Sequence, residues 1–153
     1  MKKLHITGGI PLNGELSVHG AKNSSLPILA AAASVHGKTI LHNCPQLSDV
    51  DAACEILSSL GCRITRTATT VEVDTEGMDS YHVPEHLMRE MRSSIVFLGP
   101  IAARMGKAQI SFPGGCELGP RPIDLHLAGL RQLGLNIQEE HGILDCELRQ
   151  DKF

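Results

Sequence analysis

The sequence NSSLPILAAAASVHGK at residues 23–38 returns in altered form as RSSIVFLGPIAARMGK at residues 92–107, an offset of 69. The identical pairs are Ser24/Ser93, Ser25/Ser94, Leu29/Leu98, Ala33/Ala102, Gly37/Gly106 and Lys38/Lys107. Further along, an offset of 73 pairs Val50, Asp51, Leu57, Leu60, Gly61 and Ile64 with Ile123, Asp124, Leu130, Leu133, Gly134 and Ile137. The second copy therefore has four extra residues, which fall in PGGCELGPRP at residues 113–122. A repeat of this length implies a core shared between the copies.

Each copy is predicted to run helix, short strand, helix and two strands. In the first copy, Ser24 or Ser25 is expected to cap a helix that has Pro27 in its first turn and stops at Gly37. Residues 39–42 then alternate as a strand.

The second helix of the first copy is expected to be capped by Asp49 and to end at a left-handed Gly61. Strands at residues 63–66 and 70–74 follow it. Its apolar positions share one face and are Val50, Ala53, Ile56, Leu57 and Leu60.

In the second copy, Pro122 is expected at the first position of a helix that ends at Gly134. An extra helix is predicted from Pro84 to Met91, and Pro100 is expected to kink or break the helix around it. The last strand is predicted at Ile143–Leu148.

Composition restricts the function classes. The formal charge is −3, from 14 Lys and Arg and 17 Asp and Glu, whereas nucleic-acid binders usually have a basic surplus. No run of 18 apolar residues exists, so no membrane span is predicted. The N-terminal MKKLHITGGIPLNG reaches Gly and Pro before any apolar stretch of signal length, and no export signal is expected.

The five cysteines form no CxxC pair, and an odd number of reduced thiols fits a cytoplasmic chain. Cys54 and Cys62 lie in or beside an apolar helix and are expected in the core, while Cys44 and Cys146 give no signal. The histidines are scattered, and neither a Walker loop nor a GxGxxG motif is present. We therefore expect no metal and no cofactor.

Residues 111–122, SFPGGCELGPRP, are predicted to form an exposed loop, because three Gly and three Pro in twelve residues forbid regular structure. Cys116 lies at the tip of this loop, although unpaired cysteines are usually buried. Arg121 and the helix start that follows both favour a thiolate. The pattern indicates a functional cysteine.

A second candidate cluster is GAKNSS at residues 20–25, where Lys22 precedes a helix start. Free N–H groups at such a start bind phosphate or carboxylate, although a lysine there is often only solvated. Asn23 corresponds to Arg92 at the matching helix start, and Arg121 stands at a third. We predict that Lys22, Arg92 and Arg121 converge on one polyanion site.

Three stretches are similar to a known family: GAKNSSLPILAAA (20–32), MRSSIVFLGPIAARMG (91–106) and PGGCELGPRPIDLHLAGLRQLGLNI (113–137). They resemble the UDP-N-acetylglucosamine enolpyruvyl (1-carboxyvinyl) transferases, continuously from Leu4 to Leu148. A sister family, which makes 5-enolpyruvylshikimate 3-phosphate, shares the fold but typically reads GSKS near the first helix and lacks the cysteine loop. The resemblance implies an α/β (α+β) fold, an inside-out α/β barrel of βαβαββ-type repeats.

The resemblance also implies a reaction, transfer of enolpyruvate from phosphoenolpyruvate to the 3′-hydroxyl of UDP-N-acetylglucosamine with release of phosphate. This is the first committed step of peptidoglycan synthesis, and it needs no cofactor. Cys116 matches the family's catalytic cysteine, an acid for the methylene carbon, and Lys22 and Asn23 match the phosphoenolpyruvate-binding pair. Residues matching UDP-N-acetylglucosamine contacts are Arg92, Arg121, Pro122, Ile123, Asp124 and Leu125.

The family has six repeats in two domains, and two repeats are visible here. Residues 1–20 are expected to pack with the second domain, and residues 21–153 form an incomplete first domain with repeats at about 21–90 and 91–150. We expect an N-terminal fragment that is inactive alone and self-associates through exposed apolar faces. Two alternatives remain: a non-catalytic UDP-sugar-binding paralogue, and a shikimate-pathway enolpyruvyl transferase, which the cysteine loop and Lys22–Asn23 pair disfavour.

Overall fold

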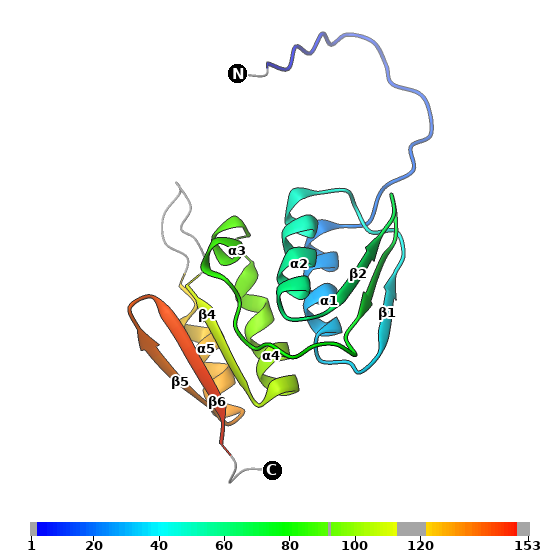
Figure 1. The fold of residues 1–153 in the computed structure, drawn as a ribbon. Coiled ribbons are helices and arrows are strands. Elements are labelled where there is room, and N and C mark those ends of the chain that lie inside the picture. Colours follow the sequence, from blue (N-terminus) through cyan, green and yellow to red (C-terminus); the bar gives the residue numbers. More distant parts are fainter. Residues whose placement is uncertain (1–2, 92, 113–121, 150–153) are drawn as a thin grey trace.

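The computed structural model describes residues 3–91, 93–112 and 122–149. Its helices are α1 (Lys22–Ala32), α2 (Ser48–Ser59), α3 (Glu85–Glu90), the 3-10 helix η1 (Ser94–Phe97), α4 (Leu98–Met105) and α5 (Asp124–Gln132). Its strands are β1 (Lys38–Leu41), β2 (Arg63–Arg66), β3 (Val71–Asp74), β4 (Lys107–Ser111), β5 (Leu135–Glu140) and β6 (Ile143–Leu148). The order helix, strand, helix, two strands occurs twice, which confirms the predicted repeat (Figure 1).

The two copies build sheets of the same topology. Strand order is β1-β3-β2 in the first and β4-β6-β5 in the second, with every pair antiparallel. Lys38 lies opposite Asp74 in the first sheet, and Lys107 lies opposite Glu147 in the second. These pairs differ by 69 residues on one strand and 73 on the other, so the sequence offsets set the strand register.

The segment between the copies lies along the free edge of β4. The amide of Gln109 donates to the Tyr81 carbonyl, and the amide of Val83 donates to the Gln109 carbonyl. The Lys107 ammonium lies 4.2 Å from the centre of the Tyr81 ring. This parallel pairing joins the first copy to the second sheet.

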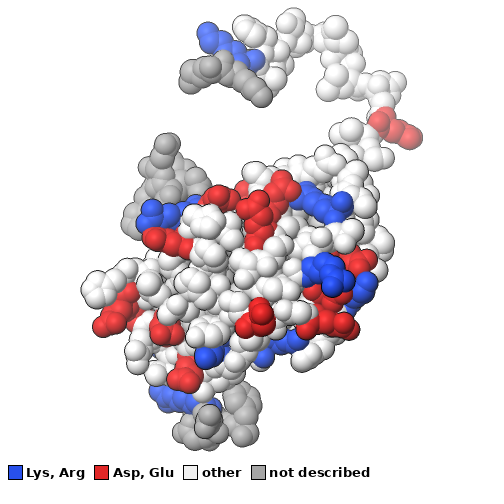
Figure 2. All heavy atoms as spheres, viewed as in Figure 1, with Lys and Arg blue, Asp and Glu red and all other residues white. Residues whose placement is uncertain are grey.

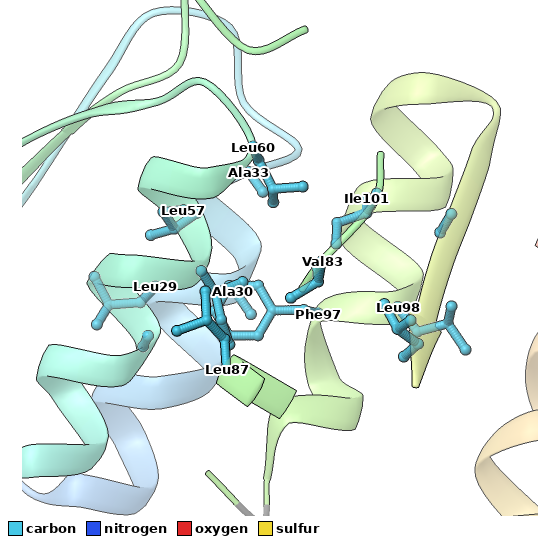
Figure 3. Close-up of a cluster of buried hydrophobic side chains, with 14 of the residues drawn as sticks. Leu29, Ala30, Ala33, Leu57, Leu60, Val83, Leu87, Phe97, Leu98 and Ile101 are labelled. Carbon is cyan, nitrogen blue, oxygen red and sulfur yellow. The ribbon is translucent and has the colours of Figure 1, made fainter. Parts of the chain in front are cut away.

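The core lies among the helices, with one sheet on each outer side (Figure 1). Phe97 is fully buried and lies between α1 and α4, close to Ala30 and Leu87 (Figure 3). The predicted buried face of α2 is confirmed, because Val50, Ala53, Ile56, Leu57 and Leu60 are all inaccessible to solvent. An arrangement with helices inside and sheets outside agrees with the expected barrel.

Both helix starts in the first copy differ from the prediction. Helix α1 begins at Lys22, two or three residues early, and Ala21 provides no side-chain cap. Ser25 instead stabilises the start from inside, because its hydroxyl donates to the Ala21 carbonyl at 3.0 Å. Pro27 therefore lies in the second turn. Asp49 does not cap α2, since the helix begins at Ser48 and no side chain caps it.

The second copy departs from expectation at its prolines. Pro100 does not end the helix: α4 continues to Met105, and the irregular turn, η1, precedes it. Because Pro100 has no N–H to donate to the turn before it, that turn tightens into 3-10 geometry. Pro122 is not the first helical residue, since α5 begins at Asp124 after Ile123.

The glycine predictions are mostly confirmed. Gly61 and Gly134 follow α2 and α5 with φ of +94° and +101°. A side chain at Gly61 would also collide with the Gly77 carbonyl oxygen, 2.5 Å from the Cβ position. Gly37 has φ of +94°, but α1 stops at Ala32, five residues before it.

Residues 3–20 form no helix or strand and extend away from the rest of the chain (Figure 1). Their large apolar side chains are 81–99% exposed: Leu4, Ile6, Ile10, Leu12, Leu16 and Val18. That this segment packs with a second domain stays a prediction. Within the described ranges, no helix is long and apolar enough to cross a membrane.

Candidate active site

Lys22 is the first residue of α1, so its ammonium lies at the start of that helix. The first turn contains no acidic residue to offset the helix dipole. The Lys22 ammonium forms an ion pair with the Asp49 carboxylate, and its side chain stays 47% exposed. Asn23 is exposed beside it. The α1 start thus combines unpaired backbone donors with one cation that solvent can reach.

The start of α2 lies next to this cation. Asp49 and Asp51 both belong to the first turn of α2, and Asp51 pairs with Arg66 of β2. Arg66 also donates to the Pro45 carbonyl at 3.2 Å. The Lys22–Asp49 contact escaped the sequence reasoning, since nothing in the local pattern pairs residues from two separate helices.

The segment matched to the UDP-sugar contacts begins α5. Pro122 precedes the helix and is exposed, while Ile123 packs against the core. Asp124 opens the helix, where a carboxylate is favoured by the dipole, and Leu125 is 87% exposed. In Figure 1, the starts of α1 and α5 lie toward the same end of the molecule.

The base of the cysteine segment is anchored on the second sheet. Strand β4 ends at Ser111, and the amide of Phe112 donates to the Gly142 carbonyl at 2.8 Å. The Ser111 hydroxyl is buried and has no hydrogen-bond partner among the described residues. A cavity of about 630 Å³ lies here, lined in part by His82, Arg89 and Phe112.

Cys116, Arg92 and Arg121 lie outside the described residues. Their positions, and the convergence of Lys22, Arg92 and Arg121, therefore stay predictions. The other four cysteines are all buried, which confirms the core assignment of Cys54 and Cys62.

Burial raises the pKa of three of these thiols. The pKa of Cys54, of Cys62 and of Cys146 is raised to about 11, chiefly because burial disfavours the charged thiolate. The Arg66 guanidinium opposes this rise at Cys54, and Arg104 opposes it at Cys62. These three cysteines are therefore poor nucleophiles near neutral pH.

Charges of both signs are interspersed over the surface. On the face in Figure 2, Lys and Arg side chains lie among Asp and Glu side chains. Over the parts of the chain that the structure covers, no three His, Cys, Asp or Glu side chains group as metal ligands would. The positive feature of this site is thus the start of α1.

The EPSP synthase (3-phosphoshikimate 1-carboxyvinyltransferase) family model matches residues 6–152. The chain belongs to the EPSP synthase family. A UDP-N-acetylglucosamine 1-carboxyvinyltransferase 2 from Caldanaerobacter subterraneus is 50% identical to this family member over 147 residues, covering 96% of the chain. A Photobacterium profundum protein named UDP-N-acetylglucosamine 1-carboxyvinyltransferase is 46% identical over 148 residues. These names confirm the resemblance seen in the motifs.

This EPSP synthase-family chain covers 35% of the length of either relative. Among solved structures, the enolpyruvyl transferase NikO from Streptomyces tendae superposes with a TM-score of 0.77 at 23% identity, over 93% of the chain and 31% of NikO. EPSP synthase from Acinetobacter baumannii gives a TM-score of 0.65 at 18% identity, over 89% of the chain and 33% of that protein. The fold is that of an enolpyruvyl transferase, present in part.

Proposed function

We propose that this chain contributes to the transfer of enolpyruvate from phosphoenolpyruvate to the 3′-hydroxyl of UDP-N-acetylglucosamine, with release of phosphate. The observation that supports this most is the Lys22–Asn23 pair at the start of α1, in a chain half identical to a protein named for that reaction. A helix start with an adjacent ammonium is suited to a phosphate group.

In the proposed reaction, Cys116 gives a proton to the methylene carbon of phosphoenolpyruvate. Positive charge then develops on the neighbouring carbon, and the sugar hydroxyl adds there. Loss of the hydroxyl proton and cleavage of the carbon–oxygen bond to phosphate regenerate the enol ether. Lys22 and Asn23 stabilise negative charge on the departing phosphate, together with Arg121.

The UDP portion is proposed to bind along Arg92 and the segment from Arg121 to Leu125. Asp124, at the start of α5, is suited to accept a hydrogen bond from the nucleotide or sugar. We place the reaction in cytoplasmic peptidoglycan synthesis. We also propose that residues 21–153 belong to one domain of a larger catalytic unit and that residues 1–20 pack with another.

Calorimetric titration of the chain tests the choice of substrate. UDP-N-acetylglucosamine should bind, and shikimate 3-phosphate should not. The opposite preference would favour the shikimate-pathway alternative and contradict the proposal.

Lys22→Met tests the anion site. Losing a charge-assisted hydrogen bond of about 1.5–3 kcal/mol should weaken phosphoenolpyruvate binding by at least ten-fold. Affinity for the sugar nucleotide should change much less, because its proposed contacts lie mainly at α5. Unchanged phosphoenolpyruvate affinity in Lys22→Met would exclude this lysine as a ligand.

A further inference from the structure

We propose that Asp49 is a positioning residue, whose carboxylate holds the Lys22 ammonium over the start of α1. The inference rests on the proposed function for the identity of the anion, the phosphate group of phosphoenolpyruvate. Asp49 itself would not touch the reacting atoms. Its role would be to fix the direction of the one cation at this helix start that the structure describes.

Lys22 needs such a partner because its four-carbon side chain is flexible. Ordering a lysine side chain costs up to about 2 kcal/mol of conformational entropy. The side chain of Asp49 is only 24% exposed, so it is held more firmly than its 47% exposed partner. Exposed ion pairs add little to stability, typically about 0–1 kcal/mol. The pair is therefore better suited to orienting Lys22 than to stabilising the fold.

The start of α2, which holds Asp49, is itself anchored to the first sheet. The Cys44 amide donates to the Thr69 carbonyl at 2.8 Å. The Gln46 side chain donates to the Ala68 carbonyl at 3.1 Å. Together with the contacts of Arg66 with Asp51 and Pro45, these bonds fix the loop before α2 at both ends.

The backbone entering α1 is fixed against the same loop. A Cβ at Gly20 would lie 2.0 Å from the Asn43 carbonyl oxygen, so only glycine allows this approach. Asn43 has φ of +54°, a left-handed conformation that asparagine tolerates. The distance between the backbones of Lys22 and Asp49 is thus set by this contact and by the packing of α1 on α2.

The ion pair leaves Lys22 able to bind an anion. An ammonium has three N–H donors, so it can donate to Asp49 and to a phosphate oxygen together. The α1 backbone amides then supply further donors to the same anion. The geometry points to a site in which Asp49 directs the remaining donors of Lys22.

Asp51→Asn is a matched control for Asp49→Asn. Both variants remove one carboxylate from the first turn of α2, but Asp51 pairs with Arg66 rather than Lys22. The first readout needs no ligand: the ¹⁵N order parameter of the Lys22 ammonium. It should fall in Asp49→Asn and stay unchanged in Asp51→Asn.

The second readout is affinity for phosphoenolpyruvate and for inorganic phosphate. Asp49→Asn should bind both roughly five-fold to ten-fold more weakly than Asp51→Asn, a loss of the size that one exposed pair provides. If Asp49→Asn bound them equally or more tightly, Asp49 would be only a competing counter-ion and the proposal would fall. If Asp49→Asn does not fold, Asp49→Glu serves instead, since it keeps the charge and displaces it by one methylene.

These readouts separate the two proposals. An ordered Lys22 ammonium that Asp49→Asn releases, in a chain that binds inorganic phosphate but not phosphoenolpyruvate, would contradict the proposed function and support the positioning role. A Lys22 ammonium that is equally mobile in the parent chain and in Asp49→Asn would contradict the positioning role, whatever ligand the chain binds.

Discussion

Burial divides the cysteines of this chain into two chemical classes. Cys54, Cys62 and Cys146 lie in the core, and a pKa near 11 leaves about a hundred-fold less thiolate at neutral pH than a pKa of 9.0 would. Cys44 is also buried. Cys116 differs from these four in its sequence setting, since a glycine- and proline-rich stretch and Arg121 surround it.

We therefore expect Cys116 to react first with limiting iodoacetamide under native conditions. Peptide mass spectrometry should find it labelled well before the other four, which should react only after denaturation in urea. Earlier labelling of Cys54 or Cys62 in the native chain would show that the loop assignment is wrong.

Gly20→Ala should destabilise the chain through a single steric contact. The new Cβ would lie 2.0 Å from the Asn43 carbonyl oxygen, and overpacking of this kind typically costs about 1–3 kcal/mol. Urea denaturation would measure the loss. Gly8→Ala is the matched control, because nothing lies within 4 Å of its Cβ position. Equal stability of the two variants would contradict the close approach.

At the scale of elements, α2 and α5 are equivalent in sequence but not in environment. Helix α2 packs against α1, α3 and β2, whereas α5 contacts mainly β5. As a result, Leu60 at the end of α2 is fully buried, and its counterpart Leu133 after α5 is 68% exposed. The repeat preserves the residue while the surroundings change its contribution.

This difference predicts unequal effects of the same substitution. Leu60→Ala should lower the free energy of unfolding by about 2–5 kcal/mol, as expected for a buried leucine. Leu133→Ala should change it by less than about 0.5 kcal/mol. Chemical denaturation of the two variants gives the comparison, and similar losses would indicate that α5 is covered in solution.

At the scale of the whole molecule, the chain presents an enolpyruvyl transferase fold that spans about a third of its relatives' length. Apolar side chains remain open to solvent at residues 3–20 and along α5. Self-association through these surfaces stays a prediction. By resemblance, the base for the sugar hydroxyl and the arginines that close over phosphoenolpyruvate belong to the second domain and have no position in this sequence.

The isolated chain should therefore show no measurable enolpyruvyl transfer. Losing a positioned base typically costs about 10²–10⁴-fold in rate. Losing the closing domain also removes orientation worth roughly 7–11 kcal/mol. A phosphate-release assay with both substrates provides the measurement. Release that depends on UDP-N-acetylglucosamine and disappears in Cys116→Ala would contradict this expectation.

The sequence by itself determined the repeat, the order of elements and the strand register. Identities at offsets of 69 and 73 were enough, because each strand pair forms within one copy and the copies align residue by residue. The buried face of α2 followed from its period, and the ends at Gly61 and Gly134 from the conformational freedom of glycine. These features depend on local spacing and backbone sterics.

Only the tertiary structure decided the helix starts and the partner of Lys22. Asp49 reads locally as a cap, but its carboxylate turns to a lysine 27 residues away, brought near by the packing of α1 on α2. The exposure of Leu133 likewise depends on which elements cover α5. Contacts between distant segments depend on how whole elements pack, and no local period encodes that packing.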